Sequence, residues 1–262
     1  MNNILEVKNL KKYFSSPKGI VHAVDDVSFG IEAGHTVGVV GESGCGKSTL
    51  GKTILRLTEY TSGEVLFEGE NVLKASRREM LRYRKEMQMI FQDPFSSLDP
   101  RMTVYQSIEE PLRIHHYCKS RSERTKRVED LMDTVGLARR YINTYPHELD
   151  GGRRQRIGVA RALAADPEIL VLDDSSPALD YRTDLALRKA LADRTKDATV
   201  IIVAQRISTI LHADRILCME HGEIVGQGTH EELMKTCPTY QEIARSQLSD
   251  VELGLEGGKT DV

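Results

Sequence analysis

A glycine-rich run that holds one lysine and one serine is the part of this chain best suited to chemistry. Residues 41–48 read Gly-Glu-Ser-Gly-Cys-Gly-Lys-Ser and match the phosphate-binding pattern Gly-x4-Gly-Lys-Ser/Thr at every fixed position. Glycines let backbone N–H groups close around an anion, and a helix N-terminus adds partial positive charge. In such a loop Lys47 reaches the β- and γ-phosphates, and the Ser48 hydroxyl binds Mg²⁺. The pattern predicts a nucleoside triphosphate site.

The elements around this run are those that a phosphate loop requires. The apolar residues 36–40 before it are typical of a buried strand, and residues 47–57 after it favour a helix. A chance glycine-rich turn would not need a strand before it and a helix after it. The predicted nucleotide contacts of the loop are Gly41, Ser43, Gly44, Cys45, Gly46, Lys47, Ser48 and Thr49.

Two further motifs are weak alone and informative beside the loop. The apolar run 169–172 ends in Asp173, which is where a P-loop protein places the acid that holds Mg²⁺ through water. The run Asp150-Gly151-Gly152 precedes a helical stretch and by itself is an ordinary helix cap and turn.

Together, in this order, the motifs resemble the nucleotide-binding domain of an ATP-binding cassette (ABC) transporter over nearly the whole chain. The matching residues are the phosphate loop, Gln92 in Phe-Gln-Asp-Pro, the Leu-x-Gly-Gly signature at 149–152, Asp173, and Ala178-Leu179-Asp180. The resemblance implies a head-to-tail dimer. ATP then lies between the phosphate loop of one subunit and the signature of the other.

The resemblance also assigns roles to individual residues. It implies that Ser48, Gln92 and Asp173 hold Mg²⁺. The catalytic residues would be Asp174, Gln205 and Gln92, and Asp150, Gly151 and Gly152 would contact nucleotide through the signature. An aromatic ring stacks on adenine in this family, for which Phe14 or Tyr13 is the candidate here; the alternative is that both are ordinary core or edge aromatics.

The chain departs from the family pattern at four positions that bear on hydrolysis. Asp174 stands where the family usually has the general base Glu, and it is shorter by one methylene, about 1.5 Å; a misplacement near 1 Å can cost about 10²-fold in rate. Gln205 replaces the switch His and cannot become cationic. Slow or absent hydrolysis is therefore expected.

The other two departures lie in the signature. Asp150 replaces Ser, and two unit charges about 4 Å apart repel by roughly 4 kcal/mol at an effective dielectric of 20, so this acid opposes a γ-phosphate. Arg153 replaces Gln and can offset part of the repulsion by pairing with Asp150 or with the phosphate.

Different parts of the chain resemble different branches of the family. Residues 92–101 and 145–149 are similar to the peptide and nickel importer branch, which favours a peptide-type cargo. Residues 173–175, 201–208 and 228–233 are similar to ABC exporters, so the direction of transport stays open.

The remaining sequence predicts an α/β fold: a P-loop NTPase core with a mostly parallel sheet, an antiparallel β subdomain and an inserted helical subdomain. Residues 4–34 suggest short antiparallel strands, residues 215–219 and 223–227 a hairpin, and residues 230–246 a helix. We expect one nucleotide-binding domain over 1–248, with the helical subdomain at about 96–165, and a disordered tail over 249–262.

The composition and charge of the chain limit the classes of binding partner that it can have. A net charge of −3 gives no general attraction to nucleic acid, and no apolar run is long enough to span a bilayer. The four scattered cysteines fit a reducing cytosol. We expect a cytoplasmic subunit, peripheral on the membrane, that binds ATP and Mg²⁺, transmembrane permease subunits and a second nucleotide-binding subunit.

The alternatives to this function are a non-catalytic, nucleotide-gated assembly subunit and an ABC protein of ribosomes or DNA. The latter usually needs two cassettes or long coiled coils.

Overall fold

The computed structural model describes residues 3–17, 19–93, 97–173 and 198–248. It divides the chain into two compact units, one of residues 1–75 with 200–262 and one of residues 76–199. The predictions at Asp174, at residues 178–180 and for the tail 249–262 lie outside the described residues.

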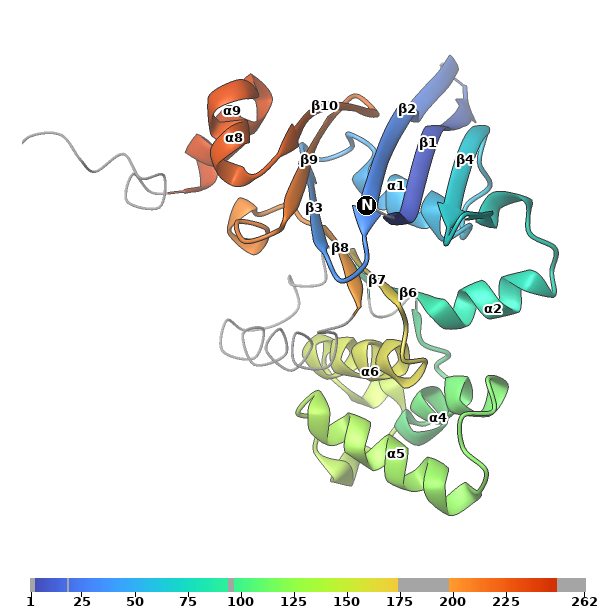
Figure 1. The fold of residues 1–262 in the computed structure, drawn as a ribbon. Coiled ribbons are helices and arrows are strands. Elements are labelled where there is room, and N and C mark those ends of the chain that lie inside the picture. Colours follow the sequence, from blue (N-terminus) through green and yellow to red (C-terminus); the bar gives the residue numbers. More distant parts are fainter. Residues whose placement is uncertain (1–2, 18, 94–96, 174–197, 249–262) are drawn as a thin grey trace, which may run out of the picture. The chain divides into compact units, whose positions relative to one another are not determined.

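The first unit contains an antiparallel sheet in the order β2-β1-β4-β5 (Figure 1). Its strands are β1 (Asn3–Ser16), β2 (Gly19–Glu32), β4 (Ser62–Phe67) and β5 (Glu70–Asn71), and a 3-10 turn follows at Val72–Lys74. The predicted antiparallel pairing is confirmed, but β1 and β2 are 14 residues each and not short. Asn9 and Asp26 have positive φ, and both lie inside these long strands, whose pairing carries bulges.

The same unit holds the strand that leads to the phosphate loop. β3 (Thr36–Gly41) is paired in parallel with β8 (Thr199–Val203) on one side and with β9 (Arg215–Glu220) on the other. β10 (Glu223–Gly228) completes the predicted hairpin with β9. His221 and Gly222 both have positive φ, which a two-residue hairpin turn of type I′ requires.

Two helices in this unit differ in their limits from the helices that the sequence predicts. α1 (Lys47–Ile54) ends three residues before the predicted end, because Arg56 adopts a left-handed conformation. The predicted helix at 230–246 is two helices, α8 (His230–Thr236) and α9 (Pro238–Gln247). Pro238 breaks the run since proline has no N–H and clashes with the preceding turn.

The second unit pairs β6 (Met87–Ile90) in parallel with β7 (Ile169–Asp173). Its helices are α2 (Glu79–Glu86), α4 (Val104–Ile114), α5 (Arg121–Thr134) and α6 (Gly151–Ala164), with 3-10 turns at Arg139–Tyr141 and Pro146–Glu148. The helical character predicted for the inserted subdomain is confirmed by α4, α5 and α6, whereas its limits at about 96–165 stay a prediction.

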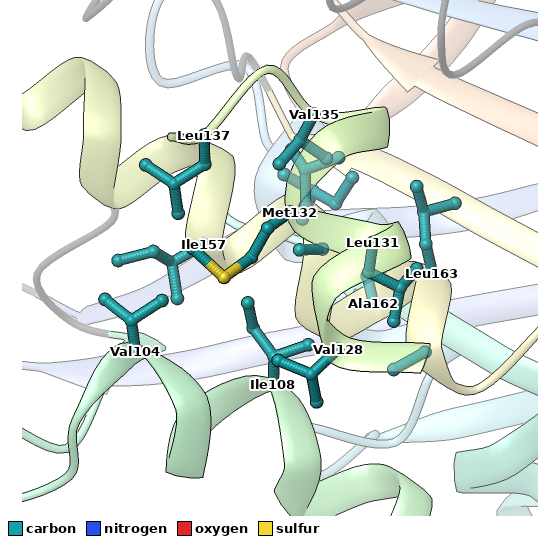
Figure 2. Packing of buried hydrophobic residues seen from close by; sticks show 14 of the residues in the cluster. Val104, Ile108, Val128, Leu131, Met132, Val135, Leu137, Ile157, Ala162 and Leu163 are labelled. Atoms are coloured by element: carbon teal, nitrogen blue, oxygen red, sulfur yellow. The ribbon is translucent and has the colours of Figure 1, made fainter. Parts of the chain in front are cut away.

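Apolar side chains of α4, α5 and α6 meet in one core, as Figure 2 shows. Burial of a large aliphatic side chain contributes about 1.5–3 kcal/mol, so this core fixes α6 and the signature at its start. Fully buried members include Ile108 of α4, Val128 and Leu131 of α5, and Ile157 of α6. None of the helices in the described ranges has both the length and the apolar character to cross a bilayer.

Candidate functional site

The phosphate loop connects β3 to α1 and depends on one glycine in particular. Gly46 is the N-cap of α1 and has φ 89° and ψ 33°, a left-handed conformation. A Cβ at this position would collide with the carbonyl oxygen of Ala23 on β2, so only glycine fits. No side chain caps α1, and the N-terminus of such a helix is suited to an anion because its N–H groups carry partial positive charge.

Lys47 lies over this loop with its ammonium group already bonded. The Lys47 side chain is buried, and its Nζ donates to the carbonyl oxygens of Gly41 and Glu42, both at 2.9 Å. The same Nζ lies 3.8 Å from the Sγ of Cys45. Burial raises the pKa of the Cys45 thiol, although nearby Lys47 acts in the opposite direction, so Cys45 is a neutral thiol at neutral pH.

The turn between β9 and β10 is hydrogen-bonded to the phosphate loop. The N–H of Gly222 donates to the carbonyl of Cys45 at 3.0 Å, and the N–H of Asp25 donates to the carbonyl of Gly222 at 2.8 Å. The hairpin turn therefore bridges the phosphate loop and β2. This support could not be predicted from the sequence, because no motif links residues so far apart in the chain.

The two aromatic candidates for adenine stacking have different surroundings. The Tyr13 ring stacks on His22 with centroids 4.0 Å apart, and its hydroxyl donates to Asp25 at 2.5 Å. Hydrogen bonds from Tyr13 and then from His22 lower the pKa of Asp25 to about 2. Phe14 is 41% exposed, and Lys12 Nζ lies 4.4 Å from its ring centroid. Which ring meets a base stays a prediction.

Gln205 follows β8 and is exposed. Its carbonyl accepts a hydrogen bond from Nε2 of Gln247 at 2.8 Å, and Oε1 of Gln247 accepts from the N–H of Ile207 at 2.9 Å. Gln247 could not be predicted from the sequence, since a polar residue at the end of a helix belongs to no motif.

In the second unit, the structure brings Gln92 and Asp173 to one edge of a strand pair. Ile90 of β6 is in register with Leu172 of β7. Asp173 is the last residue of β7 and Gln92 lies two residues beyond the end of β6, so both stand at the carboxyl ends of parallel strands. Asp173 is 2% exposed. An amide oxygen and a buried carboxylate are hard oxygen donors of the kind that Mg²⁺ prefers, so Gln92 and Asp173 fit this ion.

The signature begins at Asp150, which caps α6. Its Oδ1 accepts from the N–H of Arg153 at 2.8 Å, and its Oδ2 forms an ion pair with Arg153 Nη1 at 2.5 Å. Of the two partners expected for Arg153, the structure shows Asp150. The Arg153 guanidinium also lies 4.9 Å from the ring centroid of Tyr141, an aromatic contact that the sequence did not indicate.

Helix α6 holds the segment that carries Gln92 at two points. The buried side chain of Gln155 donates through Nε2 to the carbonyl of Phe91 at 3.4 Å, and its Oε1 has no hydrogen-bond partner among the described residues. Arg161 donates to the carbonyl of Ser97 at 2.7 Å and pairs with Glu110 at 2.9 Å. A cavity of about 320 Å³ is lined by Ser97, Leu98, Asp99, Met102, Ser107, Glu110 and Arg161.

Comparison with known proteins agrees with this geometry. The family model described as ABC transporter matches residues 24–176. An oligopeptide transport ATP-binding protein of Bacillus subtilis (strain 168) is 48% identical over 88% of this chain and 77% of its own length. Its counterpart in Escherichia coli (strain K12) is 41% identical over 87% of this chain and 69% of its own.

Solved structures give the same result. A dimeric ATP-binding cassette in a post-hydrolysis state, bound to ADP and phosphate, superimposes with a TM-score of 0.79 at 28% identity, covering 86% of this chain and 98% of that one. A bacterial Atm1-family ABC exporter with ATP bound gives 0.78 at 26% identity, covering 95% of this chain and 43% of that one. These matches confirm the predicted α/β P-loop fold. The chain therefore belongs to the ABC transporter family and is one of its ATP-binding ATPase chains.

Proposed function

We propose that this chain powers the transport of oligopeptides as the ATP-binding subunit of a membrane transporter. The observation that carries the proposal is the phosphate loop, which has every fixed residue of its motif and a backbone that only Gly46 permits. The cargo rests on the relatives, which are oligopeptide transport ATP-binding proteins at 40–48% identity.

The proposed ligand is ATP with Mg²⁺. The loop residues contact the phosphates, with Lys47 on the β- and γ-phosphates. Ser48, Gln92 and Asp173 hold the ion, which when bound would neutralise part of the phosphate charge. The remaining proposed loop contacts are Gly41, Ser43, Gly44, Cys45, Gly46 and Thr49.

Hydrolysis is proposed to be slow. Asp174 would act as the general base for the attacking water, with Gln92 and Gln205 placing that water and the γ-phosphate. The short acid and the uncharged amide both weaken this arrangement. A second nucleotide-binding subunit would supply the opposite signature, in the manner of the solved dimeric cassettes.

Membrane subunits are proposed to dock on the second unit, which places the chain on the cytoplasmic face of the membrane. The cavity beside Ser97 supports this, since it contains the half-buried ion pair of Arg161 and Glu110 and lies on the segment after Gln92. A helical segment of a permease with one polar residue at its tip would fit such a cavity.

The test combines binding and uptake. Deletion of the gene should abolish uptake of a labelled oligopeptide, and the wild-type gene should restore it whereas Lys47→Ala should not. In calorimetry, Lys47→Ala should weaken Mg-ATP binding by at least about tenfold, as expected for a lost hydrogen bond to a charged group. Unchanged uptake after deletion would contradict the peptide cargo, and equal ATP affinities would contradict the nucleotide site itself.

A second candidate is a nucleotide-gated subunit in which ATP binding alone closes the dimer. The substitutions Asp174 and Gln205 and the ion-paired Asp150 favour it. A turnover rate measured on the assembled transporter separates the two candidates.

A further inference from the structure

The side chain of Gln247, the last residue of α9, forms two hydrogen bonds with the segment that carries Gln205. Its Nε2 donates to the carbonyl of Gln205 at 2.8 Å, and its Oε1 accepts from the N–H of Ile207 at 2.9 Å. One amide thus satisfies a backbone acceptor and a backbone donor two residues apart. This pairing fixes the amide orientation, because only nitrogen can donate to a carbonyl and only oxygen can accept from an N–H.

The segment between these bonds has no regular structure of its own. β8 ends at Val203, and the N–H of Ala204 still donates to the carbonyl of Val39 at 2.9 Å. A 3-10 turn begins at Ile207. Gln205, whose side chain is exposed, lies between Ala204, which is bonded to Val39, and Ile207, which is bonded to Gln247.

Gln247 is not needed to attach α9 to the protein. Tyr240 and Ala244 of this helix are completely buried, and Leu248 just beyond it is 8% exposed, all in one apolar cluster with Ile207. These apolar contacts already hold the helix in place. The side-chain amide of Gln247 is therefore not required to attach α9 to the protein.

We propose that Gln247 is a positioning residue that holds Gln205 where it meets the γ-phosphate. The inference rests on the proposed function, in which Gln205 contacts that phosphate. ADP lacks the γ-phosphate. Loss of Gln247 should therefore weaken binding of a triphosphate and leave binding of ADP unchanged, whereas a purely structural role would affect both.

The experiment measures the affinities of Mg-ADP and of Mg-AMP-PNP, a triphosphate that is not hydrolysed, by calorimetry. Gln247→Leu removes both hydrogen bonds at similar volume. Gln247→Glu keeps the acceptor for the Ile207 N–H and loses the donor to Gln205. Arg245→Ala, an exposed position in the same turn, is the matched control. Thermal unfolding of each variant checks that it is folded.

Gln247→Leu should weaken AMP-PNP binding by about three- to tenfold, the size of one net hydrogen bond, and change ADP binding by less than about twofold. Gln247→Glu should lie between Leu and wild type, and Arg245→Ala should match wild type. In a Gln205→Ala background, Gln247→Leu should have no further effect, because residues that act through one another are not additive.

Equal losses for ADP and AMP-PNP, or additive effects in the double variant, would overturn the inference. Should Gln247→Leu not fold, Gln247→Glu decides by the same comparison. If Gln205→Ala weakens AMP-PNP binding and the Gln247 variants do not, only this inference fails. If Gln205→Ala leaves the two affinities in their wild-type ratio, the proposed role of Gln205 fails as well.

Discussion

At the residue scale, the proposed catalytic roles of Asp174 and Gln205 lead to an expected rate of ATP hydrolysis. We expect wild-type turnover below about 1 per second, at the low end for enzymes. Asp174→Glu together with Gln205→His should raise steady-state phosphate release, because the first change restores the reach of the base and the second restores a group that can become cationic. Each single change serves as the control. Robust wild-type turnover would show that the substitutions are tolerated.

The stacking partner of adenine can be identified by a pair of matched truncations. Ala23 touches the phosphate loop at Gly46, and its neighbour His22 holds the ring of Tyr13, which places this ring near the loop. Phe14 offers a more exposed ring. Tyr13→Ala should weaken ATP binding by about 1–1.5 kcal/mol, the value of an aromatic stack, and Phe14→Ala should weaken it less. Calorimetry gives both values, and a larger loss at Phe14 would reverse the assignment.

At this scale, residues that form a local motif could be predicted from the sequence and residues that act from a distance could not. The phosphate loop was predictable because its chemistry depends on spacing within eight consecutive residues. Gly222 through its N–H group and Gln247 through its side-chain amide support the candidate site, and both come from remote parts of the chain. Such contacts depend on the fold and leave no local pattern.

Helix α6 links the signature to the segment that carries Gln92. A buried acceptor without a partner costs about 1–3 kcal/mol, so Gln155 is a poor residue for packing alone. Gln155→Met, which keeps the volume and removes the donor to Phe91, should preserve or raise the thermal unfolding midpoint and lower ATP turnover. Ile157→Val is the control in the same helix. A variant that loses stability and turnover in proportion would show that Gln155 only packs.

Other elements show where sequence patterns mislead about limits. Residues 4–34 suggest short strands, yet the side chains of Asn9 and Asp26 hydrogen-bond each other at 3.2 Å across a continuous pair of long strands. The helical periodicity of 230–246 is unbroken at Pro238, but the backbone ends α8 at Thr236 and begins a second helix, α9, at Pro238. Element type was predictable from periodicity, whereas element ends depend on individual backbone conformations that periodicity does not record.

On the scale of the whole molecule, we expect the charge of Asp150 to affect ATP-dependent dimerisation. If two subunits form the proposed head-to-tail dimer, this acid faces the partner's γ-phosphate and opposes closure. Asp150→Ser should strengthen ATP-dependent dimerisation, and Arg153→Gln should weaken it because the ion pair at 2.5 Å would be lost. Both side chains are partly exposed, so the pair itself is worth at most about 1 kcal/mol.

Light scattering in Mg-ATP, in a variant blocked in hydrolysis, measures this balance. Asp150→Asn should act like Asp150→Ser but more weakly, since it removes charge and changes shape. If neither Asp150→Ser nor Arg153→Gln moves the monomer–dimer balance, the signature does not meet nucleotide and its loop has a structural role.

The bonds that Lys47 makes to the loop's own carbonyls have a consequence for selectivity. An incoming anion does not find a free cation, because it has to displace the oxygens of Gly41 and Glu42 from the ammonium group. Binding is thus an exchange of acceptors, and a ligand with only a few oxygens, such as inorganic phosphate, gains little from it. A polyphosphate chain brings enough acceptors for both the ammonium group and the N–H groups of α1. We therefore expect the loop to discriminate in this way against free inorganic phosphate.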